Sequence, residues 1–536
     1  MCGDFMNKTQ KYFFNAFLLS LASLVMRGVA VSFNVYVTSK VGAQGMGLLT
    51  LCGGVYGFCI TFATSGINMA VVRLVSSALP DDNLKSIDKN GSMRVRKIML
   101  NALFYCLFFG LVATVVLYTS ADAIAIFLLK DERATYCLKL MAFSLLPISI
   151  CSALNGYFYA VRRVYKNVIS QLCEQGFKIF VVTALLITIA PKGLEYACVA
   201  VVAGGALAEG LGVLVSSILY LFDRRLHYKK IAKNGDNVSK IDDFDTRVVP
   251  IALPVAISAY VRSALSTAEH LLIPWGFRKN GVSSASAMAS YGVLHGMVVP
   301  LLLFPSAILG AFSSLLVPEL SSALAGNDEL RIKRIVSRVF DTSLLFSLGV
   351  SGAFICFSGE LGLYIYNSEI ASHYIRLLAP LIPLMYLDGA VDSMLKGLGH
   401  QLYTMRVNIV DSLLSVLLIL VLLPSFGIKG YVAVIFITEL VNTSFSILRL
   451  LSVTNVKAYV IKWVLKPVFA IILATCISRL VFNLPFFKLS GGKLFTLVEL
   501  GFTGVLYLVI SYIIGSISQR DLSFFKGIFK GKRVKK

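Results

Sequence analysis

The stretch at residues 98–119 reads IMLNALFYCLFFGLVATVVLYT and contains no charged side chain. An apolar helix of about 20 residues is long enough to cross the hydrocarbon core of a lipid bilayer. This stretch therefore predicts a membrane-spanning helix.

Runs of the same kind recur from end to end of the 536-residue chain, and we expect about fourteen membrane-spanning helices. The run at 46–77 is rich in glycine and the run at 286–316 contains Pro300 and Pro305, so we expect both helices to be broken or kinked. The fold class is thus an all-α polytopic membrane protein. The predicted helices occupy residues 12–38, 46–77, 98–119, 138–160, 165–189, 195–222, 248–275, 286–316, 335–358, 373–395, 407–424, 430–450, 462–483 and 494–516.

The composition excludes several other classes of protein. Hydrophobic residues make up 57% of the chain and charged residues 15%, against roughly a quarter charged in a soluble domain. The chain is also basic, with 50 Lys and Arg against 28 Asp and Glu. A mean hydropathy of +0.79 excludes a soluble enzyme, a disordered chain and a nucleic-acid-binding protein, so we expect no nucleic-acid partner. The ten cysteines are scattered without a CxxC pair, and we expect neither disulfides nor a metal site.

The net charge of +22 is distributed unevenly between the two sides of the membrane. If the N-terminus is cytoplasmic, the inner loops and termini carry roughly 32 Lys and Arg, against about 9 in the outer loops, as the positive-inside rule requires. We therefore expect both termini in the cytoplasm. The tail at 517–536 interleaves lysines with phenylalanines, which suits contact with anionic phospholipid. A disordered tail that only fixes the topology is the alternative.

The chain also resembles itself. Residues 71–79 read VVRLVSSAL, residues 316–324 read LVPELSSAL, and Arg27 and Arg262 hold similar places in the first and seventh helices. Their common order predicts two parallel six-helix halves, a transporter architecture with the substrate site at the interface between the halves. The predicted domains are an N-terminal lobe at 1–222, a basic cytoplasmic linker at 223–247, a C-terminal lobe at 248–453, helices 13 and 14 at 454–516, and the tail at 517–536.

Charged side chains inside the predicted helices are candidate site residues. A charge at the bilayer centre costs roughly 2.5–3.5 kcal/mol, so it must be paired, hydrated or functional. Arg27 and Arg262 lie near the middle of their helices, and the repeat predicts that they face one central cleft. The planar guanidinium suits a pyrophosphate or an acidic sugar. The predicted substrate-binding residues are Arg27, Asn34, Arg262, Glu269 and His270.

Some of these residues have a second interpretation. Arg262 and Glu269 are seven residues apart on one helix face and can neutralise each other or a neighbour. His270 can be a hydrogen-bonded packing residue instead of a ligand or a proton sensor. No acidic residue accompanies Arg27 in its own helix, which favours a functional role for Arg27.

Carboxylates inside the helices are candidates for ion or proton coupling. Glu174 in the fifth helix and Asp411 in the eleventh hold equivalent places in the two halves. Asp388 and Asp392 lie one turn apart in the tenth helix. The alternative for this last pair is a hydrogen-bonded contact between helices or a place at the inner mouth.

Motifs of soluble enzymes are absent from the sequence. The chain has no P-loop, no HExxH and no GxSxG, and no loop reaches the size of a catalytic domain. We expect no catalytic residues, no metal and no cofactor. Transport would then be driven by an ion gradient, the membrane potential or the gradient of the substrate itself.

The seventh and eighth predicted helices carry a family resemblance. Residues 252–274 read ALPVAISAYVRSALSTAEHLLIP, residues 296–306 read GMVVPLLLFPS, and residues 316–322 read LVPELSS. Together with SQLCEQ at 170–175 and the opening from Arg27 to Gly42-Ala43, these stretches resemble the stage V sporulation protein B branch of the polysaccharide transporter family. The resemblance covers nearly the whole chain.

This resemblance implies a fourteen-helix flippase of the multidrug/oligosaccharidyl-lipid/polysaccharide exporter superfamily. Such proteins move undecaprenyl-pyrophosphate-linked sugars between leaflets by alternating access of two lobes, and the cargo implied for this branch is a peptidoglycan precursor for the spore cortex. The related lipid II flippases carry cavity arginines in helices 1, 2 and 8, of which only Arg27 has a counterpart here. Phe33 and Pro300 stand at two further such positions, and Arg262 is expected to supply the second cation. The resemblance also implies that helices 13 and 14 line a groove for the lipid tail.

We therefore expect a monomeric flippase in the bacterial cell membrane, with a lipid-linked oligosaccharide as its substrate. A drug/cation antiporter of the same superfamily is one alternative, but it predicts an acidic cavity where this sequence has arginines. The other is a non-transporting scaffold for cell-wall enzymes, which would tolerate the loss of Arg27 and Arg262.

Overall fold

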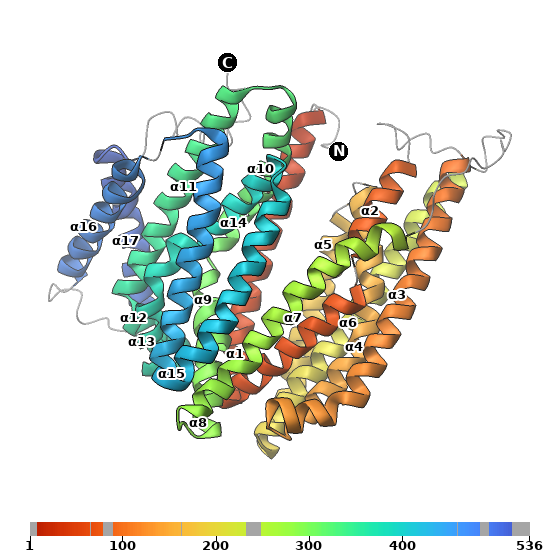
Figure 1. The fold of residues 1–536 in the computed structure, drawn as a ribbon, viewed down its shortest axis with the longest axis horizontal. Helices are drawn as coiled ribbons and strands as arrows, with labels where there is room; N and C mark the ends of the chain where they lie inside the picture. The colour runs from red at the N-terminus through yellow and green to blue at the C-terminus, as the bar shows by residue number, and fades with distance from the viewer. Residues whose placement is uncertain are drawn as a thin grey trace. The chain divides into compact units, whose positions relative to one another are not determined.

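The computed structural model describes residues 8–64, 66–78, 89–161, 163, 165–231, 248–457, 459–482 and 493–516. Every regular element within these ranges is a helix, which confirms the predicted fold class (Figure 1). Eleven helical stretches in the described part of the chain are long and apolar enough to cross a membrane, so this is a multi-pass membrane protein. The tail at 517–536 and residues 232–247 of the predicted linker lie outside the described residues.

Two of the eleven stretches, Val25–Ala78 and Gln401–Thr454, each overlap with two of the predicted runs. Each bends at a glycine with a positive φ, Gly42 at 72° and Gly427 at 57°, a backbone region that glycine enters without a steric penalty. Helix α7 (Val249–Lys279) covers the run predicted at 248–275. The total of fourteen membrane-spanning helices remains a prediction.

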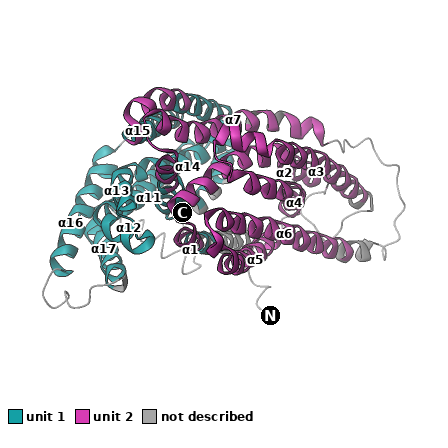
Figure 2. Cartoon of the chain, turned by 90° about the horizontal axis from the view of Figure 1, so that it is seen from below, with its two compact units in different colours: residues 1–31, 293–415, 429–536 teal, residues 32–292, 416–428 magenta. Residues whose placement is uncertain are grey.

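The described chain forms two compact units, which Figure 2 shows in different colours. Unit 1 comprises residues 1–31, 293–415 and 429–536, and unit 2 comprises residues 32–292 and 416–428. The long helices α1 (Lys8–Thr64) and α15 (Gln401–Thr454) contribute residues to both units. The lobes at 1–222 and 248–453 remain a prediction from the sequence repeat.

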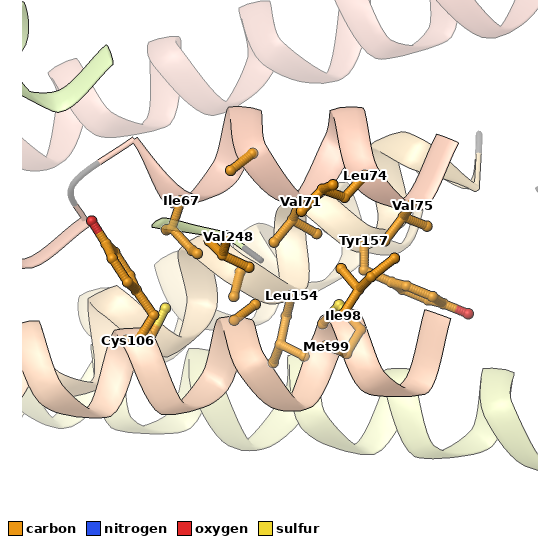
Figure 3. Close-up of a cluster of buried hydrophobic side chains, with 14 of the residues drawn as sticks. Ile67, Val71, Leu74, Val75, Ile98, Met99, Cys106, Leu154, Tyr157 and Val248 are labelled. Carbon is orange, nitrogen blue, oxygen red and sulfur yellow. The ribbon is translucent and has the colours of Figure 1, made fainter. Parts of the chain in front are cut away.

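Unit 2 is built around a helix, α4, that packs against α2, α3 and α6, while α5 packs against α6. Its apolar core includes Ile67, Val71 and Leu74 of α2 and Ile98 and Met99 of α3, which interdigitate in Figure 3. Besides its part of α1, the unit contains α2 (Ile67–Ala78), α3 (Lys89–Ala123), the π-helix η1 (Ile124–Leu129), α4 (Ala134–Ala160), α5 (Tyr165–Ile189), the short 3-10 helix η2 (Ala190–Lys192), α6 (Leu194–Ile231), α7 (Val249–Lys279) and α8 (Ser284–Tyr291).

Gly47 of α1 lets the helix approach the backbone of α8 closely. A Cβ at this position would meet the carbonyl oxygen of Met288. Gly47→Ala is therefore expected to destabilise the purified protein by about 1–3 kcal/mol, the usual effect of overpacking. Gly57→Ala on the same helix is the matched control, because nothing lies within 4 Å of a Cβ there. Equal melting temperatures of the two variants in detergent would contradict this account.

Unit 1 packs α14 against α10 and α11, and α16 against α11 and α17. Phe340 of α11 and Trp463 stack in its core with ring centroids 4.7 Å apart. Besides its part of α1 and most of α15, the unit contains the π-helix η3 (Gly292–Val298), α9 (Val299–Leu303), α10 (Ser306–Ala325), α11 (Glu329–Cys356), α12 (Ser358–Tyr366), α13 (Glu369–Leu378), the 3-10 helix η4 (Ala379–Leu381), α14 (Ile382–Gly397), the π-helix η5 (Ile461–Leu465), α16 (Lys466–Phe482) and α17 (Lys493–Ile513).

The breaks expected in the two irregular runs are confirmed. The glycine-rich run ends its first helix at Thr64 and starts α2 at Ile67, with Gly66 at a φ of 69° between them. The proline-containing run is divided into α8, η3, α9 and α10. Glycine conformation explains the first break, whereas in the second Pro300 lies in the first turn of α9 and Pro305 directly precedes α10.

Candidate functional site

Arg27 lies on α1 roughly midway between the start of the helix and its bend at Gly42. Its side chain is exposed, and it forms no ion pair or hydrogen bond with the residues that the structure describes. The next residue, Gly28, packs against Phe304, whose ring lies 3.6 Å from the position of a Cβ on that glycine. Unit 1 thus presents an unneutralised guanidinium at the middle of an apolar helix.

Arg262 holds the corresponding place in unit 2, near the middle of α7. It is also exposed, and within the described ranges it forms no ion pair. The ion pair with Glu269 that was one interpretation of the sequence is therefore not formed. Because α7 is predicted from the sequence to span the membrane, this unneutralised charge is a candidate functional group.

His270 and Asn34 have partners within unit 2. The Nδ1 atom of His270 is 2.8 Å from the hydroxyl of Tyr291, a fully buried residue of α8. The imidazole also packs against Gly54 of α1, where a Cβ would lie 3.0 Å from the His270 Cβ. Asn34 accepts a hydrogen bond of 3.2 Å from Thr38 one turn along the same helix. These contacts place His270 in the packing between α1, α7 and α8.

Glu174 of α5 faces the neighbouring helix α6. Its carboxylate lies against Gly212, and it interacts electrostatically with Glu209 of α6 and with Lys178 of its own helix. Two carboxylates and one ammonium group therefore share this part of unit 2. In a low-dielectric environment two nearby carboxylates disfavour simultaneous ionisation.

A comparable acidic group occurs in unit 1. Glu439 interacts electrostatically with Asp388 of α14 and Asp411, and it accepts a hydrogen bond of 3.3 Å from Thr443. The sequence identified Asp388 and Asp411 as coupling candidates, and the structure adds Glu439 to them. Unit 2 contains the similar group of Glu174 with Glu209, and the predicted repeat matches Glu174 with Asp411.

Asp392 differs from these carboxylates because it has a cation beside it. The Lys396 ammonium lies 3.6 Å from its carboxylate, one turn along α14. Asn408 of α15 donates to the same carboxylate at 3.5 Å. Asp392 therefore makes the contact between helices that was the alternative interpretation of the sequence.

One buried ionic cluster was not recognised from the sequence. Asp223, near the end of α6, is 1% exposed and accepts a hydrogen bond of 2.9 Å from Tyr157 of α4. Its other oxygen binds both Arg163 and Lys166 at the connection between α4 and α5. The sequence did offer one signal for this cluster: Asp223 is an acidic residue at the start of a basic segment. A buried carboxylate needs cationic partners, so an ion pair could have been expected there.

No group of His, Cys, Asp or Glu in the described ranges is arranged to hold a metal ion. The charged groups described above offer guanidiniums that can bind an anion and carboxylates that can exchange a cation or a proton.

Comparison with known proteins places this arrangement in a family. The family model described as polysaccharide biosynthesis protein matches residues 13–324, and the MatE model matches residues 280–421. Stage V sporulation protein B of Bacillus subtilis (strain 168) is 26% identical over 435 residues, which cover 78% of this chain and 80% of that protein. Lipid II flippase MurJ of the same organism is 21% identical over 429 residues, covering 76% of this chain and 75% of that protein.

The fold also matches a solved structure. Lipid II flippase MurJ in an inward closed conformation has a TM-score of 0.67 with 14% sequence identity, covering 94% of this chain and 99% of that one. This similarity concerns the fold alone. Since the polysaccharide biosynthesis model covers more than half of the sequence, this chain belongs to the polysaccharide biosynthesis protein family.

Proposed function

We propose that this protein is a flippase that moves undecaprenyl-pyrophosphate-linked oligosaccharide or peptidoglycan precursor from the inner to the outer leaflet by alternating access. It would act in the bacterial cell membrane with both termini in the cytoplasm. Membership of the polysaccharide biosynthesis family and the fold shared with a lipid II flippase support this proposal.

The observation that carries the proposal is the pair of unneutralised arginines. Arg27 in unit 1 and Arg262 in unit 2 each lie in an apolar helix without an ionic partner among the described residues. A charge in that position is costly, and a diphosphate group would neutralise it through paired N–H···O bonds. Binding of an anionic headgroup therefore accounts for both residues, whereas transport of a cation would not.

The half-buried carboxylates within the helices are proposed to couple transport to an ion or proton gradient. The relevant residues are Glu174 with Glu209 in unit 2, and Asp388 and Asp411 with Glu439 in unit 1. Asp392 is assigned a lesser part in this coupling, because Lys396 already neutralises it.

A leaflet-exposure assay with defined substrates tests the function. Purified protein in proteoliposomes is expected to move a diphosphate-linked disaccharide about tenfold faster than its monophosphate analogue, because the second phosphate adds a charged contact worth more than 1 kcal/mol. Protein-free vesicles give the background rate. Transport of organic cations in place of the lipid-linked sugar would contradict the proposal and favour the antiporter.

A further inference from the structure

The helix between α8 and α10 is interrupted within unit 1. The π-helix η3 (Gly292–Val298) is followed by α9, a turn at Phe304, and α10 from Ser306. Pro300 and Pro305 in this segment lack the backbone N–H that a helix needs. Inside a membrane the backbone groups left over must find other partners, because water is absent there.

Tyrosine hydroxyls from two other helices supply such partners for backbone carbonyls, and a third tyrosine bonds to a side chain of the segment. Tyr366 of α12 donates to the carbonyl oxygen of Met297 at 2.9 Å. Tyr386 of α14 donates to the carbonyl oxygen of Leu302 at 2.5 Å, and Tyr431 of α15 hydrogen-bonds to Nε2 of His295. All three contacts lie within unit 1.

Among these three tyrosines, Tyr386 has a hydroxyl that lies where a hydrogen bond of a continuous helix would form. In a continuous α-helix the N–H of Ser306 would bond to the carbonyl oxygen of Leu302, four residues earlier. Here the Tyr386 hydroxyl donates to that carbonyl and also interacts with the Ser306 backbone, so it is inserted into the helical hydrogen-bond ladder. Side chains inserted in this way are a known cause of kinks. Tyr386 is 3% exposed, so water does not compete for the position.

Arg27 is adjacent to this break. Gly28 packs against Phe304, the residue between Leu302 and Ser306 in the turn. The Arg27 guanidinium also interacts electrostatically with Tyr386. A positive charge attracts the negative end of a hydroxyl dipole, which directs the phenol proton away from Arg27. This orientation favours donation to Leu302.

We propose that Tyr386 is a positioning residue that couples anion binding at Arg27 to the bend between α9 and α10. The inference rests on the proposed role of Arg27. A diphosphate bound to Arg27 would cancel its positive field at Tyr386 and weaken the hydroxyl bond to Leu302. The Leu302 carbonyl and the Ser306 N–H could then bond directly, and the bend would decrease to the part that the two prolines impose.

The test compares Tyr386→Phe with Tyr507→Phe. Tyr507 is 5% exposed and donates at 2.6 Å to the carbonyl oxygen of Leu345, so it has the same chemistry at an uninterrupted helix. Tyr386→Phe is expected to lower the transport rate about three- to tenfold, the effect of one hydrogen bond, while the half-saturating substrate concentration stays unchanged. Tyr507→Phe is expected to alter the melting temperature alone.

Hydrogen exchange of the peptide around Ser306 gives a second readout that does not require transport. Undecaprenyl diphosphate is expected to change exchange there in the wild-type protein but not in Tyr386→Phe or Arg27→Ala. The same change in all three proteins, or no change in the wild type, would overturn the coupling. A coupled exchange response in a protein that does not transport lipid-linked sugar would refute the proposed function and retain this inference.

Discussion

Arg27→Ala is expected to reduce transport of a diphosphate-linked substrate about 30- to 150-fold, since a hydrogen-bonded contact to a charged group contributes about 2–3 kcal/mol. Arg262→Ala is expected to have an effect of similar size. Each substitution removes an exposed guanidinium that no described residue neutralises. Rates are measured in proteoliposomes that contain equal amounts of folded protein.

Two further variants complete this test: one separates the charge of Arg27 from the planar geometry of its donors, and the other is a control. Arg27→Lys keeps the charge but loses the planar pair of donors, so its rate is expected to lie between those of the wild type and Arg27→Ala. Arg133→Ala is the matched control, because Arg133 is already bound to Asp131 at 2.6 Å. Wild-type transport rates in both Arg27→Ala and Arg262→Ala would refute the proposed anion site.

The sequence predicts most of the fold because a bilayer imposes a length and a polarity on each helix. Apolar runs therefore locate the helices, and the bends at Gly42 and Gly427 fall between runs that were separated on this basis. The break between α9 and α10 could be expected from Pro300 and Pro305, but its position could not. At that position the hydroxyl of Tyr386, which is more than eighty residues away in the sequence, donates to the carbonyl oxygen of Leu302.

For the candidate site, the sequence identified candidate residues but not their partners on other helices. Helical periodicity shows which residues share a face of one helix, but it does not show which residue of another helix lies opposite. The sequence could therefore identify Arg262 and Glu269 as possible partners, while the structure was needed to show that they do not pair. Likewise, the contact of His270 with Tyr291 depends on how α7 packs against α8.

Asp223→Asn is expected to destabilise the protein by about 3 kcal/mol, near the lower end of the range for breaking a buried ion pair. The substitution keeps the shape of the side chain but leaves Arg163 and Lys166 without their counter-ion. Arg163 is 21% exposed, and partial hydration of its guanidinium keeps the loss near that lower end. Thermal unfolding in detergent measures the change.

Tyr157→Phe provides the comparison, because it removes a hydrogen bond to the same carboxylate without changing the charge. We expect it to cost about 1 kcal/mol. Lys166→Met should restore part of the stability lost in Asp223→Asn, since it removes one of the two uncompensated cations, and the cation–π contact of the Lys166 ammonium with the Phe158 ring offsets only part of that charge. Two results would contradict this account: Asp223→Asn is as stable as Tyr157→Phe, or Lys166→Met does not restore stability to Asp223→Asn. Either result would mean that the charge of Asp223 does not hold the α4–α5 connection against α6.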